Sequence, residues 1–212
     1  LSIDIAEREL EILKKIDYEN GYSLYIGIPF CPTTCLYCSF TSYPLVSWRQ
    51  KVDSYLDALE KELDYVAVKF GKKHLNSIYI GGGTPTTLEP YQLDRLIRKI
   101  RCSFDLSHCL EFTVEAGRPD SITREKLETL KKWDITRISI NPQTMKDETL
   151  KIIGRRHTVA QTVESFQLAR ELGFDDINMD LIMGLPEESL EDVRDTLEQV
   201  KALKPDNLTV HS

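Results

Sequence analysis

Short apolar segments alternate with longer amphipathic segments along this chain. Six of the short segments are rich in β-branched or aromatic residues and are bounded by Gly, Pro or Asn, which predicts β-strands. Their positions are residues 23–30, 77–80, 111–116, 137–140, 177–182 and 208–210. Because polar residues interrupt these runs only rarely, the pattern indicates strands buried on both faces, as in a parallel sheet.

Between the strands, apolar residues recur every three or four positions, which is the spacing of an amphipathic helix. Two such stripes are Leu56, Leu59, Leu63 and Val66, and Leu190, Val193, Leu197, Val200 and Leu203. A third helix is expected after Pro119, with Leu127 and Leu130 on its apolar side. A fourth covers residues 158–172 and ends before Gly173, a residue type that favours the helix C-cap.

This alternation predicts an α/β fold of right-handed βαβ units around a parallel sheet. Six units in ~200 residues fall short of the eight units and about 250 residues of a complete barrel. We therefore expect a partial TIM-like (β/α)6 barrel over residues 23–212, preceded by a helical lead-in over residues 1–22. An open doubly wound sheet is the alternative, but its chemistry would concentrate at one switch point. Here polar or glycine-rich groups follow almost every strand.

The composition is typical of a soluble globular protein, at 41% hydrophobic and 29% charged residues. No apolar run approaches the ~20 residues of a membrane span, and residues 3–16 are acidic and amphipathic rather than a basic leader, so we expect a cytoplasmic protein. A net charge of −7 with scattered basic residues argues against a nucleic-acid partner. The sequence begins without Met and ends inside a predicted strand, so we expect a fragment of a longer protein whose C-terminal domain lies outside it.

Three cysteines, Cys31, Cys35 and Cys38, form a CxxxCxxC motif directly after the first predicted strand. Clustered thiolates select zinc, copper(I) or iron–sulfur clusters. A structural zinc site takes four ligands, and the other cysteines, Cys102 and Cys109, are far away in the sequence. Electron-carrier clusters are normally closed by four cysteines, whereas three cysteines leave one iron open to a substrate. The motif therefore predicts an iron–sulfur cluster that does chemistry.

Other readings of the cysteines stay open. Cys35 and Cys38 alone have the spacing of a thiol redox pair, although this leaves Cys31 unexplained. A zinc site could recruit His157 or His211 as its fourth ligand. Cys102 and Cys109 are expected to be buried as small apolar residues.

Polar and glycine-rich groups gather at the predicted strand ends, where barrel enzymes bind their substrates. The glycines in residues 81–85, Gly-Gly-Gly-Thr-Pro, permit positive φ and close approach of a ligand to the backbone. The remaining strands end in or lead to Glu115, Arg118, Gln143, Arg155, Arg156, Asp180 and His211. Each also has a structural reading, such as a helix cap, a solvated arginine pair, a surface ion pair for Arg118 or a core histidine. Together they suit a zwitterionic ligand that carries a sugar.

The cysteine motif, residues 81–85 and the strand-end polar residues resemble the radical S-adenosylmethionine (SAM) enzymes. Within them the chain resembles the oxygen-independent coproporphyrinogen III oxidase family over essentially its whole length. The likeness rests on Tyr-Ile-Gly-Ile-Pro-Phe-Cys, Gly-Gly-Gly-Thr-Pro-Thr and Asp-Leu-Ile-Met-Gly-Leu-Pro. Glu-Ala-Gly-Arg-Pro-Asp and Ile-Asn-Pro-Gln-Thr-Met resemble the Gram-positive variant.

The resemblance implies a 4Fe-4S cluster on Cys31, Cys35 and Cys38, with S-adenosyl-L-methionine on the open iron. It places Tyr25 near the methionine part, and Gly82, Gly83 and Thr84 at the amino group. It assigns the other SAM contacts to Glu115, Gln143, Arg155 and Asp180, with Val210 near the adenine. A reductant such as flavodoxin or ferredoxin would supply electrons, and a 5′-deoxyadenosyl radical would decarboxylate porphyrinogen propionates in heme biosynthesis.

One position departs from the typical oxidases. Those enzymes carry a further cysteine two places after the third, where this chain has Phe40. A Phe there is the pattern of the heme-chaperone paralogues, which bind heme instead of converting a porphyrinogen. A heme chaperone on the same scaffold is therefore an alternative. Radical modification of tRNA is another, against which the acidic charge argues, and a zinc-stabilised barrel without radical chemistry is the last.

Overall fold

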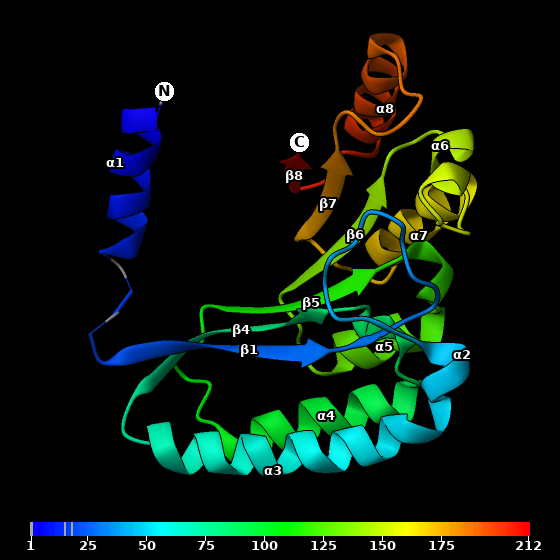
Figure 1. The fold of residues 1–212 in the computed structure, drawn as a ribbon. Helices are drawn as coiled ribbons and strands as arrows, with labels where there is room; N and C mark the ends of the chain where they lie inside the picture. Colours follow the sequence, from blue (N-terminus) through cyan, green and yellow to red (C-terminus); the bar gives the residue numbers. More distant parts are fainter. Residues whose placement is uncertain (1, 15, 18) are drawn as a thin grey trace.

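A six-stranded parallel sheet forms the centre of the computed structural model, which describes residues 2–14, 16–17 and 19–212. The strands are β1 (Gly21–Ile28), β4 (His74–Gly82), β5 (Glu111–Gly117), β6 (Arg137–Gln143), β7 (Ile177–Ile182) and β8 (Asn207–His211). They lie side by side in chain order, and the sheet twists strongly from β1 to β8 (Figure 1). All six predicted strands are present, so the prediction of a partial (β/α)6 barrel is confirmed.

The connecting helices are α3 (Val52–Phe70), α4 (Pro90–Ser103), α5 (Arg124–Lys132), α6 (Asp147–Ile152), α7 (Val159–Glu171) and α8 (Leu190–Leu203). Helices α3 and α4 run next to each other along one face of the sheet (Figure 1). The predicted helix at residues 158–172 is α7: Thr158 is its N-cap and accepts a hydrogen bond from Gln161 N. Gln161 in turn accepts one from Thr158 N, which completes a capping box.

The apolar core lies between the sheet and these helices. Strand residues on this side, such as Ile28, Ile78 and Ile138, have no exposed surface. The prediction that the strands are buried on both faces is wrong for the two end strands. Tyr25 on β1 is 62% exposed, because its side chain lines an open cavity on the inner face of the sheet, and Val210 on the last strand, β8, is 50% exposed.

The segment after β1 differs from the predicted strand at residues 23–30. Strand β1 ends at Ile28, and Phe30–Cys31 (β2) pairs instead with Tyr43–Pro44 (β3) in a separate two-stranded parallel sheet. The short helix α2 (Leu45–Trp48) and a 3-10 turn (Arg49–Lys51) lead from β3 into α3. Further 3-10 turns follow β4 (Pro85–Thr87) and β5 (Pro119–Ser121). The cysteines therefore occupy a loop that β2 and β3 close at its base.

The N-terminal helix α1 (Ser2–Leu13) ends before residue 16, the end of the predicted amphipathic stretch. Figure 1 draws it apart from the sheet, and its described side chains are exposed. The first strand begins at Gly21, inside the predicted lead-in of residues 1–22. None of the helices in the described ranges is both long and apolar enough to cross a membrane.

Candidate functional site

A cavity of about 970 Å³ opens on the inner face of the sheet and extends past its carboxyl edge to the cysteine loop. The three cysteines line it together with eight of the nine predicted SAM contacts: Tyr25, Gly82, Gly83, Thr84, Glu115, Gln143, Arg155 and Asp180. Val210 is the exception, since its neighbours Thr209 and His211 line the cavity instead. Side chains alternate along a strand, so Val210 can meet a ligand in this cavity only through its backbone.

The glycine-rich turn after β4 lies directly against the cysteine segment. Gly83 N donates to the Ile28 carbonyl and Thr84 N to the Phe30 carbonyl, both at 2.8 Å. A Cβ on Gly83 would lie 2.7 Å from the Phe30 carbonyl oxygen and 3.1 Å from Cys31 Sγ. Gly82 has a φ of +104°, which a side chain would strain. These glycines are therefore required for the turn to approach the cysteine loop this closely.

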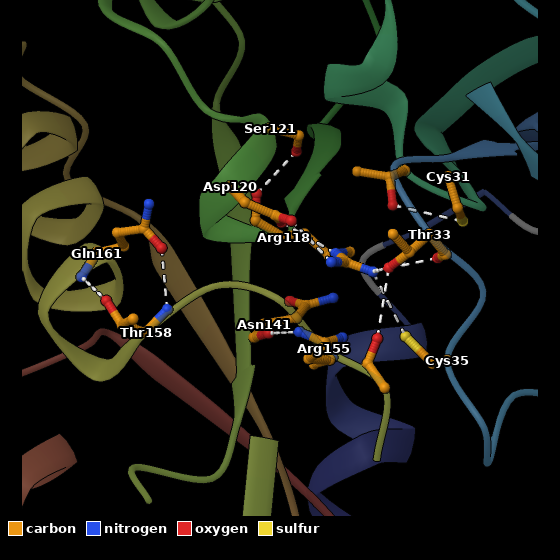
Figure 2. Close-up of polar contacts among 12 residues, drawn as sticks. Cys31, Thr33, Cys35, Arg118, Asp120, Ser121, Asn141, Arg155, Thr158 and Gln161 are labelled. Atoms are coloured by element: carbon orange, nitrogen blue, oxygen red, sulfur yellow. Dashed lines mark hydrogen bonds and ion pairs between the residues drawn. The ribbon is translucent and has the colours of Figure 1, made fainter. Parts of the chain in front are cut away.

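Arg118 fastens the cysteine loop to the end of β5, and Figure 2 shows its guanidinium between Asp120 and the loop. It donates to both Asp120 carboxylate oxygens, at 2.9 and 2.7 Å. Its Nη1 donates to Thr33 Oγ1 at 2.6 Å and to Cys35 Sγ at 3.8 Å. Burial lowers the pKa of Arg118, but the bonds to Asp120 outweigh it, so the net pKa lies above the ordinary value. With 2% of its surface exposed, Arg118 is not the surface residue that its sequence context allowed.

A second set of tethers comes from the end of α6. Leu36 N donates to the Ile153 carbonyl at 3.0 Å, and Thr33 Oγ1 to the Gly154 carbonyl at 3.4 Å. Arg155 donates to Tyr37 OH at 3.2 Å, and it also donates to the Asn141 carbonyl (Figure 2). Burial is the main cause that raises the pKa of Tyr37 to about 12, so the phenol stays protonated. Arg155 thus lines the cavity while it also supports the loop.

The opposite wall of the cavity carries carboxylates. Tyr79 OH donates to Glu115 Oε1 at 2.5 Å, and the Tyr79 ring stacks on Tyr25 with centroids 5.9 Å apart. Burial raises the pKa of Glu115, and the negative charge of Asp180 raises it further against the bonds from Tyr79 and Gly82. Asp180 accepts a hydrogen bond from Asn178 at 2.7 Å. A cationic group placed here would relieve the repulsion between the two carboxylates.

The side-chain oxygen of Gln143 is buried without a hydrogen-bond donor in the part of the chain that the structure describes. Its Oε1 is buried and makes no hydrogen bond with any described residue, and its backbone has a φ of +70°. An unpaired buried acceptor costs roughly 1–3 kcal/mol, and a non-glycine residue at positive φ adds strain. The residue that carries both energetic costs lines the cavity. An acceptor held in this way suits a ligand that donates a hydrogen bond.

The donor set of the loop fits an iron–sulfur cluster. Three thiols line one cavity, and two of them, Cys31 and Cys35, already receive hydrogen bonds from Thr84 and Arg118. Within the described ranges, no three Cys, His, Asp or Glu side chains converge closely enough for a single metal ion. The arrangement is therefore unlike a preformed zinc site, and the three cysteines that line one cavity would hold an iron–sulfur cluster with one iron left open.

The remaining cysteines and His157 lie elsewhere. Cys102 is exposed on α4, so the expectation that it is buried was wrong, while Cys109 is half-buried and donates to the Glu111 carbonyl at 3.3 Å. His157 is buried and lines a different cavity of about 910 Å³, which the loop residues Pro32, Thr33 and Thr34 also line. His211 does line the main cavity. A zinc site completed by His157 is therefore not supported by its position.

Sequence reasoning missed two residues that shape the site. Tyr79 and Tyr37 bind Glu115 and Arg155 of the predicted set, but neither lies in a recognisable spacing with its partner. Arg118 was predicted as a strand-end residue that could pair with a carboxylate, and it does pair with Asp120, but its contacts with Thr33 and Cys35 were not predicted. Tyr37 carried a sequence signal, since it lies between two cysteines of the motif.

This site defines a class of protein. A model of the radical SAM superfamily matches residues 25–200, and the chain belongs to that superfamily. Members of the superfamily use a 4Fe-4S cluster and S-adenosyl-L-methionine, and the coincidence of three cysteines, a glycine turn and paired carboxylates in one cavity agrees with both cofactors.

Individual relatives show which members of the superfamily this chain is similar to. The chain is 45% identical to the oxygen-independent coproporphyrinogen-III oxidase-like protein HemZ of Bacillus subtilis, over 99% of this chain and 42% of HemZ. It is 42% identical to the heme chaperone HemW of B. subtilis, over 90% of this chain and 50% of HemW. The structure of coproporphyrinogen III oxidase (HemN) from Escherichia coli matches with a TM-score of 0.82 and 34% identity, over 89% of this chain and 43% of HemN. The chain thus spans half the length of these relatives or less.

Proposed function

We propose that this chain is the cofactor-binding core of an oxygen-independent coproporphyrinogen III oxidase-like enzyme of heme biosynthesis. The observation that carries the proposal is the single cavity that holds Cys31, Cys35 and Cys38 beside eight predicted SAM contacts. The identity with HemZ over 99% of the chain supports the choice of this family branch. Because the chain covers only part of its relatives, the porphyrinogen-binding walls are assigned to the whole protein and not to this segment.

In this proposal the cysteines hold the cluster, and the residues around them orient SAM. When bound, these cofactors would supply radical chemistry for hydrogen abstraction from a propionate side chain. The backbone amides of Gly83 and Thr84 already donate to Ile28 and Phe30. A ligand amino group only donates, so it would bind the carbonyl oxygens of this turn. Glu115 and Asp180 face the cavity, where they would accept hydrogen bonds from the sugar hydroxyls of SAM or lie beside its positively charged sulfonium.

A heme chaperone is the second candidate, and two observations favour it. Phe40 lines the cavity and is 71% exposed at the position where typical oxidases carry a further cysteine. The chain is also 42% identical to a heme chaperone. An exposed aromatic side chain at the mouth of a cavity is suited to stack on a flat macrocycle. Both candidates share the cluster and SAM, and they differ in whether a porphyrinogen is converted.

The test uses the full-length gene product, reconstituted anaerobically with iron and sulfide. The protein is reduced with dithionite in the presence of SAM and coproporphyrinogen III, and the products are separated by chromatography and mass spectrometry. The oxidase proposal expects both 5′-deoxyadenosine and porphyrinogens that have lost CO₂. The Cys35→Ala variant, which lacks one cluster ligand, is the matched control and should give neither product.

The two candidates then give opposite results. Deoxyadenosine without any decarboxylated porphyrinogen contradicts the oxidase proposal. Stable heme binding at one site per chain, together with that absence, selects the chaperone. A protein that assembles no cluster under any reconstitution condition contradicts both.

A further inference from the structure

The cysteine loop has a buried cationic neighbour that the proposed cofactor chemistry leaves unexplained. The Arg118 side chain is 3% exposed, and that of its partner Asp120 is 18% exposed. A buried charge is retained in a fold only when it is paired and hydrogen-bonded. Asp120 alone would satisfy the pairing, yet the guanidinium also reaches across to the loop.

The orientation of this ion pair is the central observation. Nε and Nη2 of Arg118 face Asp120, whereas Nη1 faces Thr33 and Cys35 (Figure 2). The planar guanidinium fixes these directions relative to each other. The positive side of the pair therefore points at a cysteine sulfur, and the negative carboxylate lies on the far side of the guanidinium.

Arg118 is itself held by a buried network behind it. Ser121 Oγ donates to the Arg118 carbonyl at 2.7 Å and lies 2.6 Å from Thr86 Oγ1. Lys126 Nζ donates to the carbonyls of Thr86 and Ser121, at 2.6 and 3.1 Å. The turn after β4 and the turn after β5 are thus locked together behind Arg118, so its guanidinium has little freedom to swing away from the loop.

From this arrangement we infer that Arg118 is a positioning residue that sets the reduction potential of the cluster held by Cys35 and its partners. The inference rests on the proposed cluster site. Hydrogen bonds to cluster sulfurs and nearby charge are two of the levers that tune such potentials. A cationic donor on a ligand sulfur stabilises the more negative, reduced state, so it raises the potential and eases one-electron reduction by an external reductant.

Substitution of Arg118 and substitution of Asp120 should shift the reduction potential in opposite directions. Arg118→Gln removes the charge and should make the reduction equilibrium about tenfold less favourable, which is about 59 mV more negative for a one-electron couple. Asp120→Asn keeps Arg118 and removes the anion behind it, so the potential should move in the positive direction by a smaller amount. Arg118→Lys retains a charge without the planar fork and should fall between Arg118→Gln and the wild type.

The matched control is Arg95→Gln. Arg95 also binds two carboxylates, Asp57 and Glu60, but it does so between α3 and α4 on the outer side of the sheet. Its loss should leave the potential unchanged. The potential is measured by redox titration of the reconstituted full-length protein without SAM, with the reduced cluster followed by electron paramagnetic resonance. Iron and sulfide are quantified in every variant.

The outcomes separate this inference from the proposed function. Opposite shifts in Arg118→Gln and Asp120→Asn, with none in Arg95→Gln, support it. If Arg118→Gln fails to hold the cluster, the inference is judged by Asp120→Asn: a positive shift of its potential supports it, and a negative shift contradicts it. A wild-type cluster whose potential stays the same in Asp120→Asn and in every cluster-bearing Arg118 variant overturns this inference alone. A wild-type protein without any cluster overturns the proposed function and this inference with it.

Discussion

Two adjoining sides of the cavity, the turn after β4 and the cysteine loop, are built in different ways. The turn at residues 81–84 is fixed by backbone hydrogen bonds to Ile28 and Phe30, and its glycines allow the close approach. The cysteine loop is fixed by side chains and carbonyls that come from distant parts of the chain, such as Arg118 and Ile153. A ligand that bridges the two sides therefore depends on one rigid wall and one wall that is tethered.

This difference predicts how each side fails. A rigid backbone turn is disrupted by added volume, because nothing there can move aside. A tethered loop is disrupted by the loss of a tether or by a change in the charge of its supports. The following experiments test the contrast, in order of decreasing expected effect.

The largest effect is expected from Cys35→Ala on the tethered side. One of three ligands is lost, so cluster assembly should be abolished, whereas the fold should remain because the loop lies outside the apolar core. Iron and sulfide analysis with circular dichroism checks both halves of the prediction. Cys102→Ala, at an exposed position on α4, is the control and should assemble a normal cluster. Retained iron and sulfide in Cys35→Ala would contradict the ligand assignment.

Acid should destabilise the folded protein because His157, which lies near the tethered side, is buried. Burial, with the nearby charge of Arg155, lowers the pKa of His157 to about 4, and Asp120 and Arg118 also act on it. The unfolded chain takes up a proton near pH 6.5, but the folded protein does so only near the lower pKa. Stability is therefore full above about pH 6.5 and falls as the pH drops towards 4, by about 3 kcal/mol in total.

Urea unfolding at a series of pH values measures this loss. His157→Gln should flatten the part of the curve between pH 6.5 and 5, where most carboxylates are still ionised. His108→Gln, which changes an exposed histidine, should leave it unchanged. Identical pH curves for the wild type and His157→Gln would show that this histidine does not couple to folding.

Asp180→Asn should weaken SAM binding and leave the cluster intact. A hydrogen bond to a charged group contributes roughly 1.5–3 kcal/mol, so the Kd for SAM should rise about tenfold to a hundredfold. Equilibrium dialysis of the reconstituted protein measures the Kd. Asp195→Asn, at an exposed site on α8, is the control. An unchanged Kd would remove Asp180 from the SAM contacts.

Gly83→Ala should destabilise the rigid side by ~1–3 kcal/mol, the usual cost of overpacking. The new methyl group would meet the carbonyl oxygens of Phe30 and Ile28, at 2.7 and 2.8 Å, and neither backbone can yield easily. Gly27→Ala on the adjacent strand is the matched control, because its methyl group would meet only Tyr25 at an ordinary 3.7 Å. Equal unfolding free energies for the two variants would argue against a rigid turn.

The sequence predicted the rigid side better than the tethered side. Glycine runs and strand periodicity are local signals, so residues 81–85 and all six strands could be placed from the sequence. The tethers join residues that are far apart, such as Arg118 to Thr33 and Arg155 to Tyr37, and no local pattern encodes these pairs. The small sheet of β2 and β3 was missed for the same reason, since Tyr43 and Pro44 do not resemble a strand on their own.

The tether between Leu36 and Ile153 also has a consequence for how the protein matures. A ribosome produces Leu36 long before Ile153, and at ~5–20 residues per second the interval is on the order of ten seconds. During that time the three cysteines have been synthesised, but Ile153, which holds their loop, has not. The cysteine loop can therefore reach the geometry seen here only after most of this chain has been synthesised.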